Sequence, residues 1–174
     1  APRLTSRRDR RPASMPRRIY ASMLLLMMVW AAAAILLPHP DNPEPSAPAA
    51  RIDRHAAMPV DVAATLRTSC FDCHSFETHW PWYTNVFPAS MLLRRHVREG
   101  RAAMNLSEWA GYSRFEQADL LDDMCSEAAH GHMPPPSYLW LHRDAALDPA
   151  GIDALCDWTS LEAERLMLST GGTP

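Results

Sequence analysis

Apolar residues follow two different patterns along the chain. Between Ile19 and Leu37 they form a run without a charged residue, whereas after residue 60 they recur every three to four positions among polar residues. The nineteen residues of the run are about 28 Å long as a helix, close to the roughly 30 Å hydrocarbon core of a bilayer. The pattern predicts one transmembrane helix over residues 19–37, followed by a domain of amphipathic helices.

Helix signals divide the second part into several short elements. Ser113 and Glu116 have the spacing of a capping box, and Asp148 followed by Pro149 is a typical helix start. No segment keeps a period-two alternation, so the domain is predicted to be all-α with long loops over residues 75–89 and 131–147. The expected helices cover residues 60–68, 90–101 with a break near Gly100, a turn or short helix from 107, 114–129, and 149 to about 169.

Proline punctuates the segment between the apolar run and the domain. Six prolines fall between residues 38 and 59, which contain few large apolar residues. Such a composition predicts a stiff tether, or a strap along a neighbouring subunit.

The 174 residues suffice for one folded core. The expected organisation is a tail (1–18), a transmembrane helix (19–37), a Pro-rich linker (38–59), a helical domain (60–169) and a C-terminal tail (170–174).

Charge is divided unequally between the two ends of the chain. Residues 1–40 carry seven arginines and one aspartate, whereas residues 41–174 carry ten arginines and nineteen acids. The positive-inside rule keeps the basic tail in the cytoplasm and places the acidic domain on the other side.

A cleaved signal peptide is the competing interpretation, but the apolar run continues past the small residues of the best cleavage site. A twin-arginine signal fits poorly because Asp9 and Arg10 follow Arg7 and Arg8. The overall charge of −3 argues against a nucleic-acid binder.

One motif indicates a specific chemistry. Cys70-Phe71-Asp72-Cys73-His74 places two thiols three positions apart and a histidine directly after the second. This is the attachment pattern of haem c, in which both thiols bond the porphyrin and the histidine binds the iron. A redox dithiol would be expected beside a βαβ pattern, which is missing, and a zinc site needs two more ligands in close spacing. The motif therefore predicts one covalently bound haem c held by Cys70, Cys73 and His74.

Further short motifs carry a family resemblance. The chain has the haem motif, then Trp80-Pro81-Trp82-Tyr83, Pro88, Glu99-Gly100-Arg101, Asn105-Leu106-Ser107-Glu108-Trp109 and Met133-Pro134-Pro135, in that order. Over about residues 60–165 it resembles the haem-binding domain family of small single-haem c-type cytochromes. The resemblance implies a cytochrome c-like, mostly helical, exported domain. In the ligand loop it departs from the family pattern, because Pro136 and Ser137 stand before Tyr138.

The iron needs a sixth ligand if the haem only carries electrons. Met133 is the first candidate because it sits in a proline-stiffened loop between two predicted helices, and the family resemblance implies the same residue. Methionine opposite histidine raises the reduction potential relative to two histidines. The rival ligands are His130, His132, His142, His96, Met104 and Met124; an open iron site is the remaining alternative.

Other candidate residues have ordinary roles as their first interpretation. Cys125 and Cys156 lie on the last two predicted helices, where they form either a disulfide in an oxidising compartment or two buried thiols. The tryptophans and Tyr83 are expected in the core or the haem crevice, with a docking patch as the alternative. No acid–base dyad, nucleophile with a base, or phosphate loop is recognisable, so no catalytic residue is predicted.

The expected function follows from these features. We expect a single-pass protein of the bacterial inner membrane, with its N-terminus in the cytoplasm and a periplasmic domain that transfers single electrons. Its partners would be the lipid bilayer, donor and acceptor proteins, and the subunits of a respiratory or photosynthetic complex, and no nucleic acid. The alternatives are a haem-based sensor or peroxidase-like enzyme with an open iron site, and a structural subunit in which the haem is incidental.

Overall fold

The computed structural model describes residues 16–38, 40–47 and 49–169, and within them it contains helices and no strand. The chain divides into two units, residues 1–38 and 39–174. The expected all-α class is confirmed for these residues. The elements are α1 (Arg17–Leu36), α2 (Ile52–His55), α3 (Val60–Ser69), α4 (Phe71–His74), η1 (Trp82–Asn85), α5 (Ala89–Ala103), η2 (Leu106–Gly111), α6 (Arg114–Ala129), α7 (Pro136–Leu139), η3 (Arg143–Ala145) and α8 (Pro149–Leu168).

The described part of the first unit, residues 16–38, contains one helix, α1. Its sequence is uncharged from Ile19 onward and its 20 residues form an apolar helix long enough, by length and composition, to cross a membrane. At 1.5 Å per residue the helix is about 30 Å long, which matches the hydrocarbon core. The expected apolar helix is therefore present. Of the basic tail expected over residues 1–18, residues 1–15 lie outside the described residues, and Arg17 and Arg18 belong to the first turn of α1.

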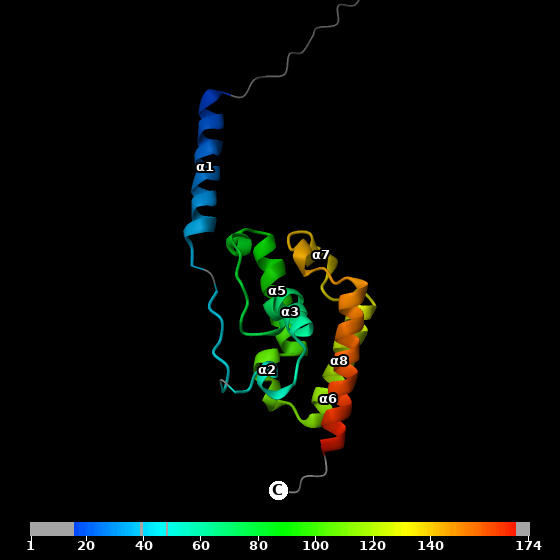
Figure 1. Ribbon diagram of the computed structural model, residues 1–174. Coiled ribbons are helices and arrows are strands. Elements are labelled where there is room, and N and C mark those ends of the chain that lie inside the picture. The colour runs from blue at the N-terminus through cyan, green and yellow to red at the C-terminus, as the bar shows by residue number, and fades with distance from the viewer. Residues whose placement is uncertain (1–15, 39, 48, 170–174) are drawn as a thin grey trace, which may run out of the picture. The chain divides into compact units, whose positions relative to one another are not determined.

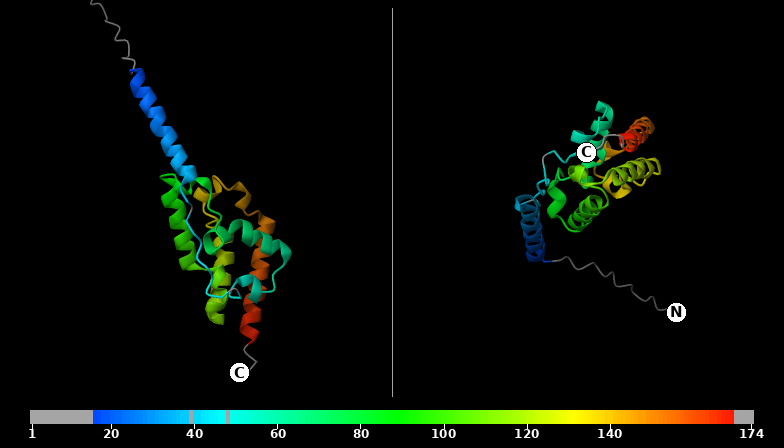
Figure 2. Two further views of the ribbon diagram at one scale, coloured as in Figure 1. Left: turned by 90° about the vertical axis from the view of Figure 1, so that its left-hand side faces the viewer. Right: turned by 90° about the horizontal axis from the view of Figure 1, so that it is seen from below.

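The second unit is built around two long antiparallel helices, α6 and α8, which lie side by side (Figures 1 and 2). Both begin as the sequence predicts. Ser113 and Glu116 form the capping box of α6, and the Asp148 side chain accepts a hydrogen bond from Gly151 N at the start of α8. Cys125 on α6 and Cys156 on α8 are joined by a disulfide, with their Cα atoms 4.8 Å apart.

The core of this unit lies where α3, η2 and α2 pack against the α6–α8 pair. Its largest side chains are almost fully buried: Trp109, Ile52, Leu66, Leu106, Leu121 and Leu155. Trp158 also belongs to the core, and its indole N–H donates to the Ala57 carbonyl at 3.0 Å. The residues of this core come from three stretches of the chain, 52–71, 104–128 and 155–166.

The segment expected to be a linker differs from that expectation. Its second half contains α2, where Ile52 is fully buried and Ala56 joins the core. Its first half packs along the domain, where Ser46 N donates to Glu108 Oε1 at 2.7 Å and Ala110 N donates to the Ala50 carbonyl at 2.9 Å. Ile52 was missed because one apolar side chain among polar neighbours gives no helical period. The folded domain begins before residue 60.

Two further local expectations needed correction. The helix over residues 90–101 does not break near Gly100, since α5 continues to Ala103. The long loops also contain short helices: η1 lies in the first, and α7 and η3 lie in the second. A single turn of helix leaves too short a pattern to be recognised from periodicity.

Candidate functional site

The Cys-x-x-Cys-His motif forms a single helical turn between α3 and α5. Cys70 is the joint between α3 and α4, and its carbonyl accepts hydrogen bonds from Cys73 N at 3.2 Å and from His74 N at 2.9 Å. Side chains three positions apart in such a turn lie on one face. Phe71, in the same turn, is buried in the core and so fixes the turn on the domain.

A cavity of about 580 Å³ opens beside this turn. This is within the roughly 300–1,000 Å³ typical of sites for small molecules and cofactors. Cys70, Cys73 and His74 line it, and so does Met133 from the loop after α6. The structure therefore brings together the four residues that the sequence predicts to hold a haem. Most of the other lining side chains are apolar, among them Ala103, Leu120, Ala128, Pro134, Leu147 and Leu155.

His74 is oriented by its own backbone surroundings. Its Nδ1 lies 3.1 Å from the Met104 carbonyl oxygen. Because a carbonyl only accepts hydrogen bonds, Nδ1 carries the proton and Nε2 keeps its lone pair. Burial lowers the pKa of His74, although hydrogen bonds to the Met104 and Gly100 backbone act in the opposite direction. The imidazole is thus held in the neutral form that binds metals.

The two motif cysteines are half-buried free thiols. Burial, with a smaller contribution from the neighbouring Cys73, raises the pKa of Cys70 to about 12. Burial and the Asp72 carboxylate raise the pKa of Cys73 to about 11, while Arg101 acts in the opposite direction. A reactive dithiol has a lowered thiol pKa instead. Among the described residues, no group of three or more His, Cys, Asp or Glu side chains is arranged to hold a metal ion.

Gly100 allows α5 to approach the motif. A Cβ atom built on Gly100 would lie 2.6 Å from the Cys73 carbonyl oxygen and 3.1 Å from the Cys73 Cβ. Only a glycine therefore permits this contact between α5 and α4. From the sequence, the same glycine indicated a helix break. Its role is a long-range contact, which local pattern cannot reveal.

Met133 reaches the cavity because of the way α6 ends. Gly131 takes a left-handed conformation with φ of 69°, and the amides of His132 and Met133 both donate to the Glu127 carbonyl, at 3.0 and 3.1 Å. This closure turns the chain back toward the cavity. The Met133–Pro134 peptide is cis. Met133 is 41 % exposed, so it lies at the rim of the cavity rather than beneath it.

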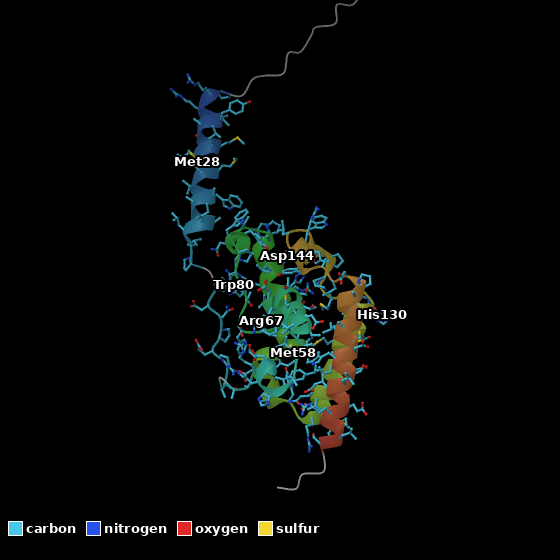
Figure 3. The ribbon with its side chains drawn as sticks, viewed as in Figure 1. Met28, Met58, Arg67, Trp80, His130 and Asp144 are labelled. Atoms are coloured by element: carbon cyan, nitrogen blue, oxygen red, sulfur yellow. A yellow bond between two sulfur atoms is a disulfide. The ribbon has the colours of Figure 1, made fainter. Side chains whose placement is uncertain are left out.

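The rival ligands divide into two groups. Met104, Met124 and His96 line the same cavity as Met133. His130 and His132 are outside it and stack on each other, with ring centroids 5.8 Å apart. His130 projects from the outer side of the domain (Figure 3). His142 also lies outside this cavity, beside a second cavity of about 410 Å³.

An unexpected hydrogen bond joins the ligand loop to the motif. Tyr138 Oη donates to Asp72 Oδ2 at 2.8 Å. The Tyr138 ring stacks on His142 with centroids 4.1 Å apart, and the His142 Nε2 atom lies 3.0 Å from Tyr83 Oη. Burial, together with the bond to Asp72, raises the pKa of Tyr138 far above its usual range. The only sequence signal for this contact was an aromatic residue shortly after Met133-Pro134-Pro135.

Arg101 braces the segment that follows His74. Its Nε donates to the Ser75 carbonyl at 2.8 Å and its Nη2 donates to Thr78 Oγ1 at 2.9 Å. The guanidinium also lies over the Phe76 ring, 5.2 Å from its centroid. The other arginines of α5, Arg94, Arg95 and Arg98, are exposed, whereas Arg101 is half-buried.

Fold and site together define an all-helical protein with a mostly apolar cavity beside a Cys-x-x-Cys-His turn. The sequence model of the haem-binding domain family matches residues 29–161. The chain therefore belongs to the haem-binding domain family. Searches of curated proteins and of solved structures found no match.

Proposed function

We propose that this protein is a membrane-anchored c-type cytochrome that carries single electrons on one covalently bound haem c. The observation that carries the proposal is the shared cavity: Cys70, Cys73, His74 and Met133 all line it, although Met133 is 59 residues away from His74 in sequence. Membership of a haem-binding family supports the cofactor.

The residues of the cavity fit such a group. Each thiol, Cys70 and Cys73, would add its sulfur to one carbon of a vinyl group and its hydrogen to the other, which forms a thioether without an oxidant. His74 would bind the iron through Nε2, because Nδ1 is already engaged with the Met104 carbonyl. Met133 would supply its thioether from the loop. When bound, the haem supplies a one-electron iron couple.

The surroundings of the cavity suit electron transfer. Most of the lining is apolar, although Asp72, Glu99, Asp123 and Glu127 also reach it, and Arg101 and Tyr138 hold the segments on either side of the cavity. Methionine as the second axial ligand favours a higher reduction potential than a second histidine would. Segments held in this way change little between the two oxidation states of a bound haem, which favours electron transfer over reaction chemistry.

The membrane side of the proposal rests on α1 and the charges beside it. The helix is followed by an acidic domain and preceded by arginines, so the positive-inside rule favours a cytoplasmic N-terminus. The disulfide between Cys125 and Cys156 suits an oxidising compartment such as the periplasm. We assign the protein to the bacterial inner membrane with the haem domain outside the cytoplasm.

We further propose that it works as a subunit of a respiratory or photosynthetic complex. The support is the arginine-rich sequence of residues 1–18, which suits acidic loops of neighbouring subunits or anionic lipid headgroups. Deleting residues 1–16 while keeping Arg17, Arg18 and α1 should preserve membrane insertion but reduce co-purification with partner subunits. Co-purification at full yield would remove the docking role of the tail.

The spectrum of the full chain, purified in mild detergent, tests the electron-carrier function. We expect a six-coordinate low-spin haem, a reversible one-electron titration, and no binding of carbon monoxide to the reduced iron on mixing. A high-spin haem that binds carbon monoxide at once would instead favour the sensor or peroxidase-like alternative. Unchanged electron flux in membranes after loss of the haem would favour a structural subunit.

A further inference from the structure

Six large apolar side chains are exposed at one end of the haem domain. Trp82 is 64 % exposed and Trp140 is 84 % exposed, although tryptophan usually buries its large ring. We call this group the apolar cap: Trp82, Phe87, Met91, Leu92, Trp140 and Leu141. Exposed apolar residues are normal when scattered, but a cluster marks an interaction site.

The two parts of the cap lie on neighbouring elements. Trp82 belongs to η1, and Phe87, Met91 and Leu92 follow it into the first turn of α5. Trp140 and Leu141 follow α7. The contact between Tyr83 and His142, 3.0 Å long, connects η1 to the residue directly after Leu141. Figure 1 and the left view of Figure 2 agree that η1, the start of α5, and α7 lie at the same end of the domain.

The linker contacts the domain through Asn42, beside the segment that leads into η1 and beside the last turn of α5. The Asn42 side chain makes three hydrogen bonds. Its Oδ1 accepts from Trp80 Nε1 at 3.1 Å and from Arg101 Nη2 at 2.9 Å. Its Nδ2 donates to the Thr78 carbonyl at 2.9 Å. From there the linker continues along the domain to η2, where Ala110 N donates to the Ala50 carbonyl (Figures 1 and 3). Trp80, which holds Asn42, is two residues before Trp82.

The chain between Asn42 and α1 is short. The helix α1 ends at Leu36, six residues before Asn42. At roughly 3.3–3.6 Å per residue these six residues reach about 20 Å at most. A helix that crosses the bilayer as far as Leu36 therefore keeps Asn42, and Trp80 that binds it, within about 20 Å of the outer end of the anchor. This step rests on the membrane anchor of the proposed function.

We propose that the apolar cap lies in the headgroup region of the bilayer that α1 crosses and fixes the orientation of the haem domain on the membrane. Tryptophan is favoured at that depth because its ring is apolar and its N–H is polar. Arg94 and Arg95 stand three and four positions after Met91 on α5 and are both exposed, and Arg95 already pairs with Glu99 through its Nε at 2.8 Å. Arg94, and the remaining N–H groups of Arg95, can pair with lipid phosphates. The domain then presents the same face to its partners at every encounter.

Hydroxyl-radical labelling of the full chain in lipid nanodiscs, one chain per disc, tests this proposal. The nanodiscs contain phosphatidylcholine and phosphatidylglycerol, and labelling is read by mass spectrometry after correction for intrinsic reactivity. Phe115 at the start of α6 and Leu168 at the end of α8 serve as internal controls because they are 65 % and 73 % exposed and lie at the other end of the domain. We expect Met91 and Trp140 to be labelled several-fold more slowly than their exposure predicts, and the controls to be labelled normally.

A second measurement reads orientation directly. Linear dichroism of the haem absorption in aligned bilayers should show a fixed haem angle in the wild type. Replacing Trp82, Met91 and Trp140 by serine should abolish the dichroism while the absorption spectrum stays the same. The matched control, Phe115→Ser with Leu168→Ser, should keep it.

The outcomes separate the cap from the anchor. If the full chain is removed from membranes by alkaline washing, the anchor and the cap proposal both fail. If the chain stays in the nanodisc and the cap is labelled like the controls, the cap proposal alone is overturned. Protection that arises only in discs holding two chains would also overturn it, in favour of contact between copies.

Discussion

Tyr138 Oη donates a 2.8 Å hydrogen bond to Asp72 Oδ2, which joins the loop of Met133 to the residue between Phe71 and Cys73. Tyr138 stands five residues after Met133, and Asp72 stands two residues before His74. The two proposed axial ligands are therefore connected through one side-chain contact. Since the loop contains no long helix, this contact is a main restraint on where Met133 can lie.

Replacing Tyr138 by phenylalanine tests this restraint. The variant keeps the ring that stacks on His142 but removes the donor to a carboxylate, so it should lower the free energy of unfolding by about 1.5–3 kcal/mol. Urea unfolding should show a lower midpoint with an unchanged slope. The Met133 ligand should also be displaced more easily by imidazole. An unchanged midpoint and unchanged imidazole affinity would show that the bond does not hold the loop.

Gly100→Ala should interfere with the motif itself. The added Cβ would lie 2.6 Å from the Cys73 carbonyl oxygen, so either α5 or the motif turn must move. We expect a loss of about 1–3 kcal/mol, as in overpacked cores, and a lower yield of protein with attached haem. Gly111→Ala is the matched control because a Cβ there meets no atom within 4 Å. Equal behaviour of the two variants would contradict the assigned role of Gly100.

Met133→Ala should open the iron without releasing the haem. The thioether bonds at Cys70 and Cys73 would remain, whereas the spectrum should become high-spin or water-bound and the potential should fall. Met104→Leu and Met124→Leu are the controls, because both residues line the same cavity and the exchange nearly conserves volume. A low-spin spectrum retained in Met133→Ala but lost in one of the controls would identify that residue as the ligand.

The disulfide between Cys125 and Cys156 should stabilise the domain without affecting the haem. It closes a loop with a sequence separation of 31. Loop entropy alone gives such a crosslink a contribution of about 3–4 kcal/mol. The double serine variant should therefore unfold at lower urea with an unchanged haem spectrum and potential. A changed spectrum would mean that the bridge also sets the shape of the cavity, since Met124 and Leu155 are its neighbours in sequence.

Sequence pattern predicted those features whose cause is local. The bounds of α6 and α8 follow from the capping box at Ser113 and from Asp148-Pro149, and both were confirmed. The meeting of Met133 with the motif was expected from family resemblance, and the structure brings these residues to one cavity.

Features with a long-range cause were missed. The burial of Ile52, the contact of Gly100 with Cys73, and the bond from Tyr138 to Asp72 each join segments that are far apart in sequence. The docking of Asn42 on Arg101 spans 59 residues. Such contacts depend on how the helices pack, and no local period or propensity records them.

The central claim is that Cys70 and Cys73 carry a covalently bound haem c. The most direct measurement is the intact mass of the full chain after denaturation and extraction with acidified organic solvent. The account predicts a polypeptide heavier by one haem, with a haemochrome spectrum typical of two thioether bonds, and loss of that mass when both cysteines are replaced by alanine. Haem that leaves the denatured chain into the solvent, with two free thiols remaining, would contradict it.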